Sequence, residues 1–257
     1  MRSICTPIAL LLLACGTDPS ARPGTVGTRG GDFFGGGGGD RERSDADAGP
    51  PRGVGEVTGF VRRLADLTRT ADRGAPVAGA TVSGTSPEGD VVTTSSGLDG
   101  AFGLAGIDLD PTALCEVDSE PPSRVIVEAA RATDAVLPVV DAVFLEDVAA
   151  SVGVAVEGLS GHAFVWMRDD RGFPIDGLSV TVTSVSPVRG PFFEAGDPVL
   201  LSESGPTGPS GLVVLMAGLP DDYSLDVFRA GEPDSSASLT IEIVAGAVTF
   251  YEATVRL

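Results

Sequence analysis

The chain has 257 residues, a formal net charge of −19 and no Lys, Asn or Gln, so all 17 of its basic residues are Arg. The missing lysines exclude Schiff-base chemistry and a Walker-type phosphate site, and a single His excludes a multi-His zinc centre. The acidic balance argues against nucleic-acid binding, which requires a basic surface. We therefore expect no nucleic-acid partner, no metal and no cofactor.

The first 14 residues have the features of a secretory signal peptide. Arg2 precedes an apolar run over residues 8–14, which is too short to cross a bilayer about 30 Å thick. The sequence Leu12-Leu13-Ala14-Cys15-Gly16 resembles the lipobox of bacterial lipoproteins. That resemblance implies cleavage before Cys15, acylation of Cys15 with chains such as palmitate, and anchoring in the outer membrane. The alternative is an ordinary signal peptide with a chance Cys near its cleavage site.

The three cysteines leave no disulfide in the mature protein. Cys5 departs with the signal peptide, Cys15 becomes the lipid anchor, and Cys115 is left without a partner. No His lies near Cys115 in the sequence to activate it, so we expect a small buried hydrophobic side chain and not a catalytic thiol.

Residues 15–54 are rich in Gly, Asp, Arg and Pro and include five consecutive glycines at 35–39. Such a composition cannot bury enough apolar surface to fold. We expect a disordered tether, with a root-mean-square span of roughly 35 Å as a flexible coil.

The remainder contains an internal repeat. Residues 73–82 match 171–180, residues 97–107 match 208–219, and residues 148–152 match 244–248, in the same order. The repeat predicts two domains, over residues 55–158 and 159–257.

Apolar residues alternate with polar ones in both copies, and turn clusters separate the short runs. This pattern is typical of antiparallel β-sandwiches, so we predict an all-β chain with two tandem Greek-key sandwiches of transthyretin-like or immunoglobulin-like type. The Val-rich tract 139–150 is predicted as a strand, because its end matches a strand of the second copy.

A motif in the first copy resembles the carboxypeptidase regulatory-like family. It consists of Gly-x-Val at 59–61, Gly-x-Pro-Val-x-Gly-Ala-x-Val at 74–82 and Asp-Gly-x-Phe-x-Leu at 99–104. The second copy is more divergent, with Ser210 in place of the motif's Asp, and the first copy carries a polar insertion at 108–123. The resemblance implies transthyretin-like sandwiches that serve as accessory or interaction modules. The motif's Asp-Gly pair predicts a tight turn, after which Phe102 and Leu104 point into the core.

Two groups of side chains are candidates for function. A catalytic role for His162 would require a nucleophile and an acid beside it, and we expect instead a His on an edge strand or linker. Trp166, Phe192 and Phe193 could contact a glycan if exposed, with the Phe pair in a long loop; the favoured alternative is that the Phe pair packs over the end of the sandwich.

Together these features predict a non-catalytic, lipid-anchored outer-membrane protein facing the periplasm or the cell surface. Its two modules would serve a structural or protein-interaction role, and the alternative is a carbohydrate-binding lipoprotein of starch-binding-like type. The membrane is a partner through Cys15, and the remaining partner is an unknown protein or glycan. The acidic surface favours a neutral or cationic one.

Overall fold

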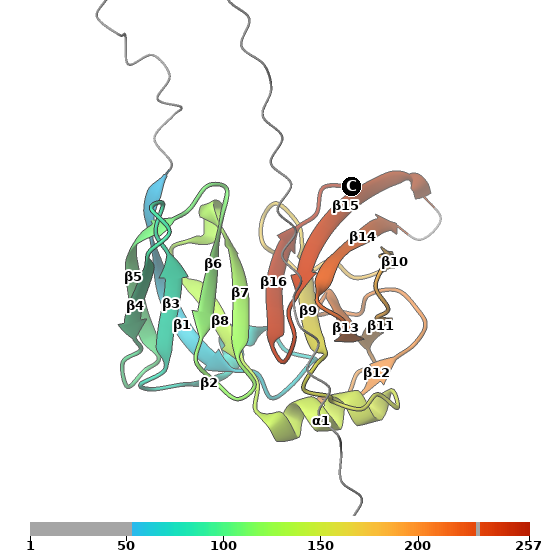
Figure 1. Ribbon diagram of the computed structural model, residues 1–257. Coiled ribbons are helices and arrows are strands. Elements are labelled where there is room, and N and C mark those ends of the chain that lie inside the picture. The colour runs from blue at the N-terminus through green and yellow to red at the C-terminus, as the bar shows by residue number, and fades with distance from the viewer. Residues whose placement is uncertain (1–52, 230–231) are drawn as a thin grey trace, which may run out of the picture. The chain divides into compact units, whose positions relative to one another are not determined.

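A computed structural model describes residues 53–229 and 232–257. The signal peptide, the lipobox with Cys15 and nearly all of the predicted tether lie outside these residues. The described chain is almost entirely β-structure, as the alternating pattern predicts (Figure 1).

The first half of the described chain contains eight strands followed by a helix. They are β1 (Val54–Arg63), β2 (Ala75–Pro76), β3 (Thr81–Thr85), β4 (Val91–Ser95), β5 (Ala101–Asp108), β6 (Thr112–Val117), β7 (Ser123–Glu128), β8 (Ala135–Val139) and α1 (Ala142–Ser151), with 3-10 turns at Ala71–Arg73 and Ala129–Arg131. The second half contains β9 (Gly161–Arg168), β10 (Leu178–Thr183), β11 (Arg189–Glu194), β12 (Leu201–Ser202), β13 (Leu212–Gly218), β14 (Asp221–Arg229), β15 (Glu232–Ile243) and β16 (Val248–Thr254).

These strands form three sheets, one of which runs through both halves. Sheet A contains β2, β1, β5 and β8, and sheet C has the order β10-β14-β15. Sheet B has nine strands in the order β12-β11-β13-β9-β16-β7-β6-β3-β4. The two halves are therefore joined by backbone hydrogen bonds within one sheet.

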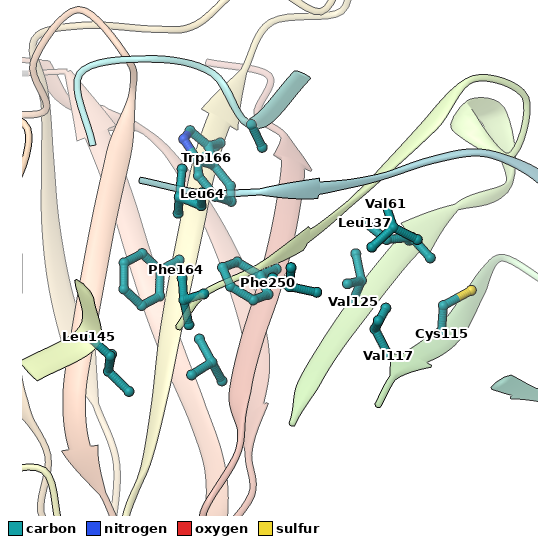
Figure 2. Packing of buried hydrophobic residues seen from close by; sticks show 14 of the residues in the cluster. Val61, Leu64, Cys115, Val117, Val125, Leu137, Leu145, Phe164, Trp166 and Phe250 are labelled. Atoms are coloured by element: carbon teal, nitrogen blue, oxygen red, sulfur yellow. The ribbon is translucent and has the colours of Figure 1, made fainter. Parts of the chain in front are cut away.

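The joining strand is β16, which pairs in parallel with β7 of the first half and with β9 of the second. Phe250 of β16 is opposite Val125 on one side and Phe164 on the other. Its ring centroid lies 5.5 Å from that of Phe164 and 6.1 Å from that of Trp166, with which it stacks (Figure 2). A single apolar cluster thus extends across the junction.

Strand β9 packs between the two apolar clusters. All eight of its residues are buried, because both faces of sheet B are covered at this point. Ala163, Val165 and Met167 face sheet C and its core. Phe164 and Trp166 point to the opposite face, where they belong to the cluster that contains residues of sheet A and α1.

The prediction of a strand over residues 139–150 is wrong, because β8 ends at Val139 and α1 begins at Ala142. The Asp141 carboxylate caps the helix by accepting a hydrogen bond from the Phe144 N–H at 2.8 Å. Phe144, Leu145 and Val148 recur at helical spacing and are buried.

The match between residues 148–152 and 244–248 is consequently not structural, since the former contain the end of α1 and the latter a turn leading into β16. By topology the counterpart of β16 is β8, which pairs in parallel with β1 as β16 does with β9. The polar insertion at 108–123 contains β6, which pairs with β3 and β7 as β14 pairs with β10 and β15.

The other two sequence matches correspond to equivalent hydrogen bonds. In the first half the Ser96 hydroxyl accepts from the Ala80 N–H at 2.9 Å and donates to the Val77 carbonyl at 2.7 Å. The Ser96 N–H also donates to the Ala80 carbonyl at 2.9 Å. We call this arrangement the hydroxyl clasp; it fixes the start of β3 against the chain that leads out of β4.

The second half has the same clasp with Thr207 in place of Ser96. The Thr207 hydroxyl accepts from the Leu178 N–H at 3.0 Å and donates to the Ile175 carbonyl at 3.0 Å. The Thr207 N–H donates to the Leu178 carbonyl at 2.8 Å. The repeat in the sequence is therefore a repeat of backbone and hydroxyl geometry.

The predicted Asp-Gly turn is confirmed at Asp99-Gly100. Gly100 has φ +82°, and the Asp99 carboxylate accepts from the Ala101 N–H at 3.0 Å. The next strand buries Phe102 and Leu104 on one face, as predicted. Gly211 is the counterpart of Gly100, and its φ is +68°.

The shared core predicts cooperative unfolding. Phe250→Ala should lower the free energy of unfolding by roughly 3–5 kcal/mol, because it removes a ring that contacts both halves. Phe173→Ala, at a side chain that is 64% exposed, is the control and should change the free energy by less than about 0.5 kcal/mol. Urea unfolding followed by tryptophan fluorescence and circular dichroism should give one transition. Two separate transitions, or equal effects of the two variants, would contradict the joined core.

Candidate functional site

A cleft of about 570 Å³ lies beside the junction of the two halves. We call it the junction cleft. Its polar wall includes Glu128, Arg131, Asp170, Arg171 and Glu252. Trp166 and Phe250, from the shared apolar cluster, also line it. Acidic and basic groups from both halves therefore meet in one cavity, and the two buried rings lie behind them.

Ion pairs across β16 hold this polar wall. Glu252 of β16 accepts from Arg131 at 2.9 Å, on the side of the first half, and from Arg168 of β9 at 2.8 Å, on the side of the second. The Arg168 side chain is only 6% exposed, so the Glu252 carboxylate is needed to compensate its buried positive charge. The pair of Arg residues fixes the Glu252 carboxylate between the two halves.

Glu128 completes the network from the end of β7. Its carboxylate accepts from the Thr254 hydroxyl at 2.9 Å and from the Tyr251 hydroxyl at 3.3 Å. Burial, followed by the nearby Glu128 charge, raises the pKa of Tyr251 to about 12. Tyr251 is consequently a neutral hydrogen-bond donor at physiological pH.

Two buried donors near the wall have no hydrogen-bond partner among the described residues: the indole N–H of Trp166 and the Nε–H of Arg168. Both residues lie on β9 two positions apart, so their side chains point to the same face of the strand. The same stretch of β9 thus supplies both unpaired donors.

The three predicted aromatic contacts are buried. Trp166 is 0% exposed, Phe192 2% and Phe193 5%. The Phe pair lies on β11 and not in a loop, and its two rings point to opposite sides of sheet B, into different apolar clusters. The favoured alternative is that the Phe pair packs over the end of the sandwich; the rings are buried, but they pack on the two faces of sheet B. None of the three presents a ring to solvent in this structure.

His162 is not on an edge or in a linker, as predicted, but on the central strand β9. It is 2% exposed, and its Nδ1 accepts from the Ala217 N–H at 3.4 Å. Burial lowers the pKa of His162 to about 4. The sequence placed His162 at an edge because it begins the second copy; the neighbouring strand β16 lies some 85 residues further on.

Cys115 is buried on β6, as expected. Burial raises the pKa of its thiol to about 12, which keeps it protonated. Among residues 53–229 and 232–257, no three His, Cys, Asp or Glu side chains gather closely enough to hold a metal ion. The helix in this part of the chain is too short to cross a membrane.

Sequence comparisons give no assignment: no family model and no curated protein matches the chain. Solved structures that resemble it include the Bacillus anthracis TIE protein, at 11% identity and TM-score 0.25, covering 78% of this chain and 34% of that one. The Streptococcus agalactiae minor pilin GBS52 aligns at 11% identity and TM-score 0.28 over 78% of this chain and 94% of its own. The shaft pilin SpaA of Lactobacillus rhamnosus GG aligns at 10% identity and TM-score 0.25, covering 80% and 100%.

The buried His162 predicts a specific pH dependence. Its pKa is about 4 in the folded chain and about 6.5 when unfolded, so the unfolded state takes up the proton first. The stability that His162 contributes is therefore complete above pH 6.5 and is lost as the pH falls towards 4. Between pH 7 and pH 5 the wild type should lose about 2 kcal/mol more than His162→Gln.

Urea unfolding at both pH values measures this difference. The variant shares every carboxylate with the wild type, so their titration cancels in the comparison. Parallel pH profiles for the two proteins would show that His162 can be protonated in the folded state.

Proposed function

We propose that this chain is a non-catalytic, lipid-anchored protein of the bacterial cell envelope that presents a rigid β-sandwich pair for structural or protein-interaction roles. The main observation in support of this proposal is the shared sheet B, in which β16 joins both halves through backbone hydrogen bonds. A rigid body of this kind can hold two surfaces at a fixed separation, which suits a scaffold or a bridge between partners.

The chemistry of the described residues supports the non-catalytic part of the proposal. His162 is neutral and buried, and the Cys115 thiol is buried and protonated. Neither can reach a substrate as placed, so within the described residues no His or Cys is available for a His-dependent or thiol-dependent mechanism.

The anchoring part rests on the sequence around Cys15. Acylation at this position, followed by the tether over 15–54, would place the sandwich pair some distance from the outer membrane. The tandem carboxypeptidase regulatory-like assignment stays a prediction based on the motif residues in both copies.

Anchoring can be tested by comparing wild type with Cys15→Ser. In cells fed labelled palmitate, the wild type should take up the label and sediment with the outer membrane, whereas the variant should do neither. Protease treatment of intact cells then gives the orientation: release of the domains shows a surface position, and resistance until the envelope is permeabilised shows a periplasmic one. Membrane fractionation of Cys15→Ser like that of the wild type would refute lipid anchoring.

Carbohydrate binding is the second candidate, and the junction cleft is the observation that favours it. Its lining alternates carboxylates and guanidinium groups beside the Tyr251 hydroxyl, so it offers both donors and acceptors to a neutral sugar. The site would be this cleft and not the buried Trp166, Phe192 and Phe193.

Titration calorimetry with a panel of neutral oligosaccharides tests this candidate. Arg171→Ala removes an exposed cation of the lining and should weaken any binding about tenfold, the effect of one charged hydrogen bond, without lowering the melting temperature. Arg69→Ala, at an exposed Arg paired only with Asp66, is the control. Absence of saturable binding by the wild type would remove the candidate.

A further inference from the structure

The two halves share the hydroxyl clasp but differ in the segment that leads into it. In the first half the chain that precedes Ser96 runs as β4, antiparallel to β3. Thr94 lies opposite Val82, and Val92 lies opposite Gly84. The clasp makes Ser96 and Ala80 a hydrogen-bonded pair. Hydrogen-bonded and non-hydrogen-bonded pairs alternate along an antiparallel ladder, so Thr94–Val82 and Val92–Gly84 are hydrogen-bonded pairs as well. Strand β4 therefore covers the edge of β3.

In the second half, no strand of the described residues is hydrogen-bonded to the corresponding edge. The chain before Thr207 passes through Pro206, which has no N–H, and β12 pairs instead with β11. Strand β11 in turn pairs with β13, across sheet B. Among the strands of residues 53–229 and 232–257, β10, the counterpart of β3, pairs with β14 alone (Figure 1).

The unpaired backbone groups on this edge can be identified from the clasp. Leu178 turns its N–H and C=O away from β14, towards Thr207. The backbone of every second residue points the same way in an antiparallel strand, so Val180 and Val182 also direct their N–H and C=O groups away from β14. Within the described part of the chain, no hydrogen bond outside the β10–β14 ladder involves these two residues.

A groove of about 520 Å³ lies along this edge. One side is formed by Ser179, Val180 and Thr181 of β10, and the other by β11 with Phe192 and Phe193. The groove thus borders the free backbone edge of β10 on one side and β11 on the other. An extended peptide has the shape and the hydrogen-bonding groups to fill such a space.

We propose that the edge of β10 binds an extended segment of a partner protein, which adds to sheet C as an antiparallel strand. The proposal rests on the protein-interaction role proposed for this chain and names its surface and ligand class. The first half supplies the template: the guest strand occupies at Val180 and Val182 the position that β4 occupies at Val82 and Gly84.

The template also predicts the chemistry of the guest. Strand β4 reads Val-Val-Thr-Thr-Ser, a β-branched sequence with high strand propensity. Val92 lies opposite Gly84 in the first half, whereas Val182 stands at the position of Gly84 in β10, so the guest residue at this point meets a β-branched side chain. Because the chain has a net charge of −19, an uncharged or cationic guest is favoured, and a second copy of this acidic chain is disfavoured.

The probe is a capped synthetic peptide with the sequence of residues 91–96, VVTTSS, added to the full-length chain. Fluorescence anisotropy of the labelled peptide should show saturable binding. Hydrogen exchange should show that the amides of Val180 and Val182 exchange faster than those of Ser179 and Thr181 in the free protein, and become at least about tenfold more protected with peptide.

A matched pair of variants locates the site. Val180→Pro removes an outward N–H without removing a bond to β14, and should weaken peptide binding about tenfold or more. Thr93→Pro is the control. Val92 and Thr94 form the hydrogen bonds to β3, so the Thr93 N–H points outward from β4, which is an edge strand of sheet B and not part of sheet C. This variant should leave affinity unchanged. The hydrogen-exchange measurement on the wild type tests the site even if one of the proline variants is unstable.

Three results would overturn the proposal: no saturable binding, equal affinity of Val180→Pro and the wild type, or Val180 and Val182 amides that are already protected in the free chain. Protection that rises with protein concentration would identify a second copy as the occupant, and protection independent of concentration would mean that the chain covers its own edge. None of these outcomes bears on the palmitate and fractionation tests of Cys15→Ser, so the two proposals fail separately.

Discussion

The pairing of β16 with two strands that belong to different halves is the constraint on which the arrangement depends. One edge of β16 is bonded to β7 and the other to β9, both in parallel. With β16 in place, Phe250 reaches Phe164 and Trp166, and Glu252 reaches Arg131 and Arg168. The shared apolar cluster, the polar wall of the junction cleft and the complete burial of β9 are all consequences of that one placement.

The internal repeat shows how equal local geometry can lead to different surfaces. The hydroxyl clasp is the same at Ser96 and Thr207, yet the chain before it follows β3 in the first half and departs from β10 in the second. The first half thereby completes its own sheet edge, whereas the second leaves an edge beside a groove. The course of one connecting segment therefore decides which strand is left at the edge, β4 in the first half and β10 in the second.

Much of the fold can be predicted from local signals in the sequence. The alternation indicates the all-β class, and Asp99-Gly100 indicates the turn that places Phe102 and Leu104 in the core, because these features depend on residues close together in the chain. The valines of residues 139–150 favour a strand, whereas Asp141 and the spacing of Phe144, Leu145 and Val148 signal the helix α1 that the structure contains. Burial of His162, Trp166, Phe192 and Phe193 and the residues of the junction cleft could not be foreseen, because they depend on which distant strands become neighbours.

The position of β16 also sets an order of events during synthesis. All residues of β1–β8 have been synthesised once residue 139 has emerged from the ribosome. The edge of β7 and the apolar face at Val125, however, remain uncovered until β16, more than 100 residues later, has been made. Until β16 arrives, that edge is open to pairing with other chains, the hazard that unpaired strands create. A chain built this way gains from a chaperone or from rapid synthesis of its second half. Its slowest folding step should be closure of sheet B, because β7 and β16 are farther apart in the sequence than any other paired strands of the described residues.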